Sequence, residues 1–269
     1  MELDITSILD DWPYEPGQVT VRRIRGSDGR DKIQLRLDLG ILQMETTGRP
    51  DGLRPHGHES ELAYHESLLA RHRQDTGSDE GFSINTEACE LLRTEGIMYY
   101  HRYLAELVLE DFAAVERDTT RNLRMFDLCA AYAAEDSDRF VLEQYRPYVI
   151  MMRTRARGRL FQLNNRPKAA LLAVRKGMQE IREFHKRLNQ EASIAGSSEL
   201  AVLRGLAKEI ESSIPVDPVR KIRQDLDKAI KDERYEDAAT LRDRLRQLEE
   251  QNPVVSSAEE ELADLEDQE

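Results

Sequence analysis

The sequence predicts a mainly α-helical protein of the α+β kind, with a small antiparallel β-sheet at its N-terminal end. Two patterns carry this prediction. Polar and apolar residues alternate from Lys32 to Leu39, which is the two-residue period of a strand with one buried face. From Asn85 onward, apolar residues instead recur every three or four positions, which is the period of an amphipathic helix.

The predicted sheet covers about residues 18–46. A first strand-like run, which contains Val21 and Ile24, is separated from the alternating run by Ser-Asp-Gly-Arg at 27–30. Asp-Gly between two such runs indicates a hairpin, because glycine adopts positive φ without steric cost. The apolar positions shift after Gly40, so we expect a bulge or bend there.

Helices with short breaks follow the sheet. We expect them at about 60–73, 85–109, 111–134, 137–163, 167–190 and 198–214. Pro147 kinks or divides the fourth of these. The turn Asn-Asn-Arg-Pro at 164–167, with small residues such as Ala156, Gly158 and Gly177, resembles a tetratricopeptide-type helical hairpin. The pattern does not recur at the ~34-residue period of that family, so we expect helical hairpins and not a repeat array.

The net charge of −13 is unevenly distributed along the chain. Residues 251–269 contain seven acids and no Lys or Arg, so this stretch carries −7. Residues 146–187 contain twelve bases and two acids, which gives a local charge of +10. Partners respond to such local fields more than to the total charge. We expect the acidic end to be a disordered tail that increases solubility. The alternative is that this tail docks on a partner or on the basic stretch of the same chain.

The basic stretch has two interpretations. Its cations can border the packed seam of a helical hairpin, with buried stems and solvated head groups, and the acidic segment 104–144 can neutralise them. Alternatively, they bind an acidic partner or the phosphates of DNA or RNA. The residues that would do so are Arg153, Arg155, Arg157, Arg159, Lys168 and Arg175. The first interpretation is favoured, because few aromatic residues stand nearby to stack on bases.

The sequence indicates no catalytic, cofactor or metal site. His56, His58 and His65 have a spacing that fits no common metal centre, so we interpret them as surface histidines. Cys89 and Cys129 lie in apolar helical patterns and are interpreted as small buried residues. We therefore expect no catalytic residues, no metal and no cofactor. The protein is more plausibly not an enzyme.

The sequence also gives an expectation about location. No apolar run approaches the ~20 residues that a membrane helix needs. The first residues have neither the basic nor the apolar region of a secretory signal. We expect a cytoplasmic protein with no membrane segment.

The most informative segment is a pair of apolar stripes near the C-terminal end. Asp217-Pro218 is a helix start signal, and Asp-Glu-Arg at 232–234 separates the stripes. The first stripe is Ile222, Leu226, Ala229 and Ile230, and the second is Tyr235, Ala238, Ala239, Leu241, Leu245 and Leu248. Each helix is near the ~12–15-residue margin of isolated stability, so the pair needs a surface against which to bury its stripes.

This segment resembles the UVR motif, a helical hairpin found at the C-terminal end of UvrB, inside UvrC, and in some Clp-type ATPases and their regulators. The resemblance rests on Leu226, Ala229, Glu233, Tyr-Glu-Asp-Ala-Ala at 235–239, Leu-Arg-Asp at 241–243, Leu245 and Leu248. In that family the hairpin is a non-catalytic protein–protein contact that pairs with another UVR hairpin. The partner-binding residues that the resemblance implies are Leu226, Ile230, Tyr235, Ala238, Ala239, Leu241, Arg242, Leu245 and Leu248.

The rest of the chain does not resemble UvrB or UvrC, since it has no GxxxxGK[ST] phosphate loop and no recognisable nuclease segment. Its N-terminal stretch resembles uncharacterised bacterial proteins that carry the same motif. We expect four parts: a β region at 1–60, a helical-hairpin bundle at 61–214, the UVR hairpin at 217–250, and the acidic tail at 251–269.

The predicted function is that of a non-enzymatic bacterial adaptor, in which the UVR hairpin binds a protein partner or a second copy of the chain. The alternative is a DNA- or RNA-binding accessory protein in repair that uses the basic helices of 146–187.

Overall fold

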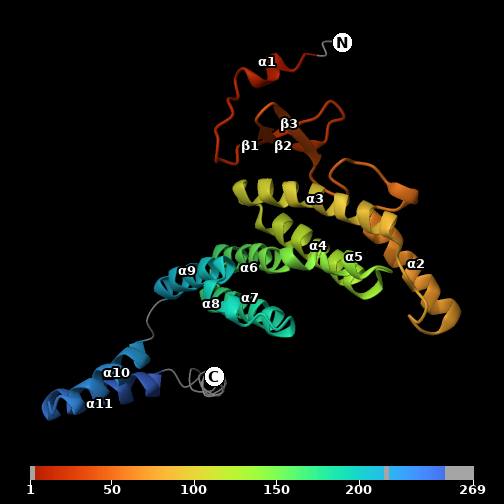
Figure 1. The fold of residues 1–269 in the computed structure, drawn as a ribbon. Coiled ribbons are helices and arrows are strands. Elements are labelled where there is room, and N and C mark those ends of the chain that lie inside the picture. The colour runs from red at the N-terminus through yellow and green to blue at the C-terminus, as the bar shows by residue number, and fades with distance from the viewer. Residues whose placement is uncertain (1–3, 215–217, 252–269) are drawn as a thin grey trace. The chain divides into compact units, whose positions relative to one another are not determined.

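The computed structural model describes residues 4–214 and 218–251 of the chain. Two compact units are present, residues 1–211 and 212–269. The first contains the β-sheet and the helices up to most of α9, which is Ser198–Ser213. The second contains α10, Pro218–Lys231, and α11, Tyr235–Gln251 (Figure 1). The predicted fold class, mainly helical with a small N-terminal antiparallel sheet, is confirmed. The predicted helix cap Asp217 and the acidic tail after Gln251 lie outside the described residues.

The sheet consists of three antiparallel strands in the order β1–β2–β3, which are Val21–Arg25, Asp31–Leu37 and Gly40–Glu45. The predicted Asp-Gly hairpin joins β1 to β2, and Gly29 has a φ of +75°. The alternating run does not continue as one strand through Leu39, however. Leu37 pairs with Gly40 across a two-residue turn, and Leu39 in that turn is 87% exposed. The shift of period at Gly40 therefore marks a third strand.

Both faces of β2 are covered. Ile33 and Leu35 pack with Met44 against Ala105 of helix α3. The polar residues of the other face, Lys32, Gln34 and Arg36, are buried as well. They are satisfied by hydrogen bonds: Gln34 donates to Gln43 at 2.9 Å, and the Nε of Arg36 donates to the carbonyl of Trp12 at 2.8 Å. The N-terminal segment thus covers a face that the alternation alone would leave in water.

The helical elements of the first unit begin with α1 Thr6–Leu9, η1 Pro55–Gly57, α2 Glu61–Thr76, α3 Thr86–Val108 and α4 Phe112–Tyr132. They continue with α5 Asp136–Phe140, η2 Glu143–Tyr145, α6 Arg146–Leu163, α7 Pro167–Arg187, α8 Ala192–Gly196 and α9 Ser198–Ser213. The predicted segment 137–163 is divided, and Pro147 stands in the first turn of α6, where its missing N–H costs nothing. Asn85 caps α3 by accepting from the amide of Ala88 at 2.9 Å.

Helix α6 packs against both α4 and α7, and α4 packs against α3. The turn from α6 into α7 is tight because Asn165 has a φ of +54°, and its amide and that of Arg166 donate to the carbonyls of Gln162 and Phe161. The two helices approach closely where Gly177 of α7 faces the buried Thr154 of α6. The antiparallel α6–α7 pair is therefore present, and its tetratricopeptide character stays a prediction.

Candidate functional site

The second unit is a hairpin of α10, Pro218–Lys231, and α11, Tyr235–Gln251, which pack against each other. The chain reverses at Glu233, whose φ is +57°. The amides of Glu233 and Arg234 donate to the carbonyls of Ile230 and Ala229 at 3.1 and 2.8 Å. This hydrogen-bond pattern satisfies the last carbonyls of α10 and reverses the chain within a few residues. Arg234 also forms an ion pair with Asp237 in the first turn of α11, at 2.9 Å.

Small residues allow the two helices to come together. Ala229 and Ala238 are buried at the crossing, and Ile222 is buried with them. Leucines continue this seam, and each of them is only half-buried: Leu226, Leu241, Leu245 and Leu248. Within the hairpin as described, α10 and α11 therefore leave the side chains of these leucines partly accessible.

Four of the predicted partner-binding residues lie away from the buried seam. Ile230 is 51% exposed and Tyr235 is 69% exposed. Ala239 and Arg242 are exposed as well. On α11, Tyr235, Ala239 and Arg242 follow one another at intervals of four and three, so they share a face about a third of a turn from the leucines. The predicted set therefore divides into residues that join the two helices and residues that face water.

Residues 217–251 match the family model of the UvrB/uvrC motif. The hairpin is a UVR motif. In other proteins, the UVR motif is known from DNA-repair and protein-interaction contexts. Searches with the chain among curated proteins and among solved structures gave no match. Within residues 4–214 and 218–251, no helix combines the length and the apolar character needed to cross a bilayer.

The cations proposed for phosphate binding are mostly paired inside the protein. Four have an acidic partner: Arg153 with Glu180, Arg157 with Glu116, Arg159 with Glu209, and Arg175 with Glu211. Arg155 and Lys168 have no acidic partner among the residues that the structure describes. The neutralising acids come from α4 and α7 and also from α9, which lies outside the acidic segment 104–144. The local charge of +10 therefore overstates the positive field of these helices.

The histidines and cysteines take different positions. His56 stacks on Tyr64 with a centroid separation of 4.0 Å, and His58 packs on the same ring. The surface position predicted for His65 is wrong: its side chain is buried on the inner face of α2, and burial lowers its pKa. Cys89 and Cys129 are buried, as predicted, and burial raises the pKa of the Cys129 thiol to about 12. A thiol with that pKa stays protonated at neutral pH and is a poor nucleophile.

Helices α3 and α4 share a buried network of charges that the sequence patterns do not predict. Arg102 is 1% exposed and donates to both carboxylate oxygens of Asp118, at 2.6 and 2.9 Å. It also donates to the carbonyls of Glu45 and Gly48 at 3.0 and 2.8 Å, which fastens the segment after β3 to the helices. The signal in the sequence is weak: Arg102 falls on the α3 face that also carries the buried Tyr99.

Glu106 belongs to the same network and is 1% exposed. Its Oε1 accepts from Arg117 at 3.0 Å, whereas its Oε2 has no hydrogen-bond partner among the described residues. Burial, assisted by the nearby Asp118 carboxylate, raises the pKa of Glu106 from 4.5 to about 8, although Arg102 and Arg117 oppose this shift. Burial therefore favours the neutral form of the Glu106 carboxyl group.

The pH dependence of stability should report this group. Because the pKa of Glu106 is raised in the folded state, its stabilising contribution is complete below pH 4.5 and is lost as the pH rises through about 8. The Glu106→Gln variant, whose amide oxygen can still accept from Arg117, should lack this decline. The difference between wild type and variant, measured by urea denaturation from pH 5 to 9, should amount to at most about 5 kcal/mol. If the free energy of unfolding changed with pH equally in the two proteins, Glu106 would be ionised in the folded state over this whole pH range.

Proposed function

We propose that this protein is a non-enzymatic adaptor whose UVR hairpin binds a protein partner or a second copy of the chain. The observation that carries the proposal is the partly accessible leucine seam with Ile230 and Tyr235 exposed beside it. In this proposal the sheet region 1–60 and the helical bundle 61–214 form the body to which the hairpin 217–250 is attached.

The energetics of a small hairpin support a partner. Ile222, Ala229 and Ala238 are the buried hydrophobic residues described in the hairpin, which is little core for two helices of this length. Complete burial of one leucine side chain stabilises the folded state by about 1.5–3 kcal/mol. The four leucines of the hairpin are only half-buried, so further burial would stabilise it more. A partner helix laid along the seam would bury Leu226, Leu241 and Leu245 further. Together with the exposed Ile230 and Tyr235, these leucines supply the apolar side chains that an interaction site would use.

Association should depend on the exposed residues of the hairpin. Replacing a central aromatic contact typically costs at least about 1–2 kcal/mol of binding, which is roughly tenfold or more in affinity. We expect Tyr235→Ser to weaken association by at least about tenfold, and Leu241→Asp to abolish it. Sedimentation equilibrium measures self-association, and cross-linking with mass spectrometry in cell extract, compared between wild type and variants, measures binding to another protein.

The matched control is Thr240→Asp, which adds the same charge as Leu241→Asp at an exposed position next to it. Its association should equal that of the wild type. Circular dichroism of each variant checks that the hairpin keeps its helices, and Tyr235→Ser removes a side chain that is 69% exposed, so it should fold normally. If both Tyr235→Ser and Leu241→Asp associate as the wild type does, the hairpin is not the contact and the proposal fails.

A DNA- or RNA-binding accessory role is the weaker proposal. Its support is that Arg155 and Lys168 have no acidic partner among the described residues. Against it, the other four proposed cations, Arg153, Arg157, Arg159 and Arg175, are already paired with carboxylates. Phosphate binding would have to compete with those pairs.

A further inference from the structure

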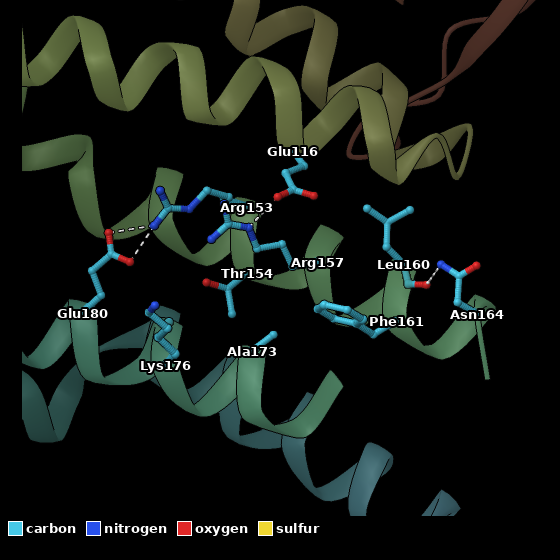
Figure 2. A pocket seen from close by; sticks show the side chains of 11 residues that line it. Glu116, Arg153, Thr154, Arg157, Leu160, Phe161, Asn164, Ala173, Lys176 and Glu180 are labelled. Carbon is cyan, nitrogen blue, oxygen red and sulfur yellow. Dashed lines mark hydrogen bonds and ion pairs between the residues drawn. The ribbon is translucent and has the colours of Figure 1, made fainter. Parts of the chain in front are cut away.

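A groove of about 380 Å³ lies between α6 and α7, with Glu116 of α4 at its rim (Figure 2). It has the size of a small-ligand site, since such sites begin at about 300 Å³. Figure 2 shows that the two ends of the groove differ. Arg153, Lys176 and Glu180 stand at one end, and Leu160, Phe161 and Asn164 stand at the other.

The charged end carries more positive than negative groups. Arg153 donates to Glu180 at 2.7 Å, and Arg157 donates through its Nε to Glu116 at 2.6 Å. The third cation, Lys176, is exposed and has no acidic partner in the described part of the chain. The groove therefore has three cations against two carboxylates, which leaves an excess of one positive charge.

The same end also has an unused hydrogen-bond donor. The Nε of Arg153 is buried, and none of the described residues accepts a hydrogen bond from it. Because this nitrogen has almost no accessible surface, a ligand in the groove would not contact it directly. The excess positive charge of the groove favours an anion with acceptor oxygens.

The other end is apolar. Leu160, Phe161 and Ala173 line it, from both α6 and α7. These side chains would cover the body of a ligand whose charged group lies at Lys176 and Arg157. The ligand that satisfies both ends has a negative group at one end and a hydrophobic group at the other.

We propose that the groove binds a carboxylate carried by an apolar group, with the carboxylate against Lys176 and Arg157 and the apolar group against Phe161. A single negative charge matches the excess of one positive charge. A phosphate monoester carries about −1.5 to −2 at neutral pH and would be repelled by Glu116 and Glu180. The carboxylate can belong to a free carboxylic acid or to a peptide, and both have the same local chemistry.

Binding of defined probes to the full chain tests the proposal. The probes are 3-phenylpropanoate for a free acid, acetyl-Phe-Glu-amide for a peptide carboxylate, and phenyl phosphate for the dianion. Titrations followed by nuclear magnetic resonance shifts should show binding of at least one carboxylate and weaker binding of phenyl phosphate. The carboxylate probe with the higher affinity identifies the source of the ligand.

The variant that tests the site is Lys176→Met, which removes the excess charge at an exposed position. Loss of a charged hydrogen-bond donor should weaken carboxylate binding by at least about tenfold. The matched control is Lys168→Met, because Lys168 is also an exposed lysine of α7 without an acidic partner among the described residues, and it does not line the groove. It should bind as the wild type does.

Three results would overturn the proposal. They are absence of binding of both carboxylates at millimolar concentration, equal affinities for the two lysine variants, and phenyl phosphate binding as tightly as the carboxylates. None of them depends on the hairpin, so this proposal and the adaptor proposal fail independently.

Discussion

Replacing Arg102 with alanine is expected to destabilise the protein by about 3–5 kcal/mol. The change leaves the Asp118 carboxylate buried at 1% exposure without its bidentate partner, and it releases the carbonyls of Glu45 and Gly48. Breaking a buried ion pair from one side is costly because the remaining charge stays in a site of low dielectric. Asp118 would keep one counter-ion, the half-exposed Arg117, whose Nε donates to it at 2.8 Å. Urea denaturation followed by circular dichroism at neutral pH measures the loss.

The control for this prediction is Arg124→Ala. Arg124 also pairs with a carboxylate, that of Glu66, but the two side chains are 57% and 33% exposed. A pair in water contributes only about 0–1 kcal/mol, so the control should stay close to wild type. If Arg102→Ala and Arg124→Ala lose similar stability, the Arg102–Asp118 pair does not have the buried character that the structure gives it.

The fold class could be predicted from the sequence because it depends on periodicity within short segments. The two-residue period of β2 and the helical period from Asn85 onward are properties of neighbouring residues. The end of β2 at Leu37 could not be predicted in the same way. Leu39 continues the alternation, and only the pairing of Leu37 with Gly40 shows that the chain turns there. Strand pairing is a contact between segments, so periodicity does not determine it.

The sequence could not predict which charged residues form ion pairs in the folded protein. Arg159 and Glu209 are fifty positions apart, and the partners Arg23 and Asp111 are eighty-eight apart. Such pairs form only after the helices have packed, so a charge count along the chain overestimates the field of α6 and α7. The hairpin is different, because both of its stripes and its turn lie within 35 residues. That is why the UVR motif could be recognised from the sequence, whereas the groove beside Lys176 could not.

A second large loss of stability is expected where α6 and α7 approach each other closely. A Cβ atom added at Gly177 would lie 2.7 Å from the Cβ of Thr154 and closer still to its Oγ1 and Cγ2. Thr154 is 2% exposed, so its side chain has little space into which it can move. Gly177→Ala should therefore separate the two helices and destabilise the protein by about 1–3 kcal/mol or more, measured by chemical denaturation.

The control is Gly205→Ala in α9, where an added Cβ meets no atom within 4 Å. The same substitution should stabilise the protein there by up to about 1 kcal/mol, because alanine is the better helix former. The opposite signs exclude helix propensity as the cause of the loss at Gly177. Adding Thr154→Ala to Gly177→Ala removes two of the three close contacts, so the double variant should be more stable than the sum of the single effects. Strict additivity would mean that Gly177 and Thr154 do not pack together, and the α6–α7 groove would then have a different shape.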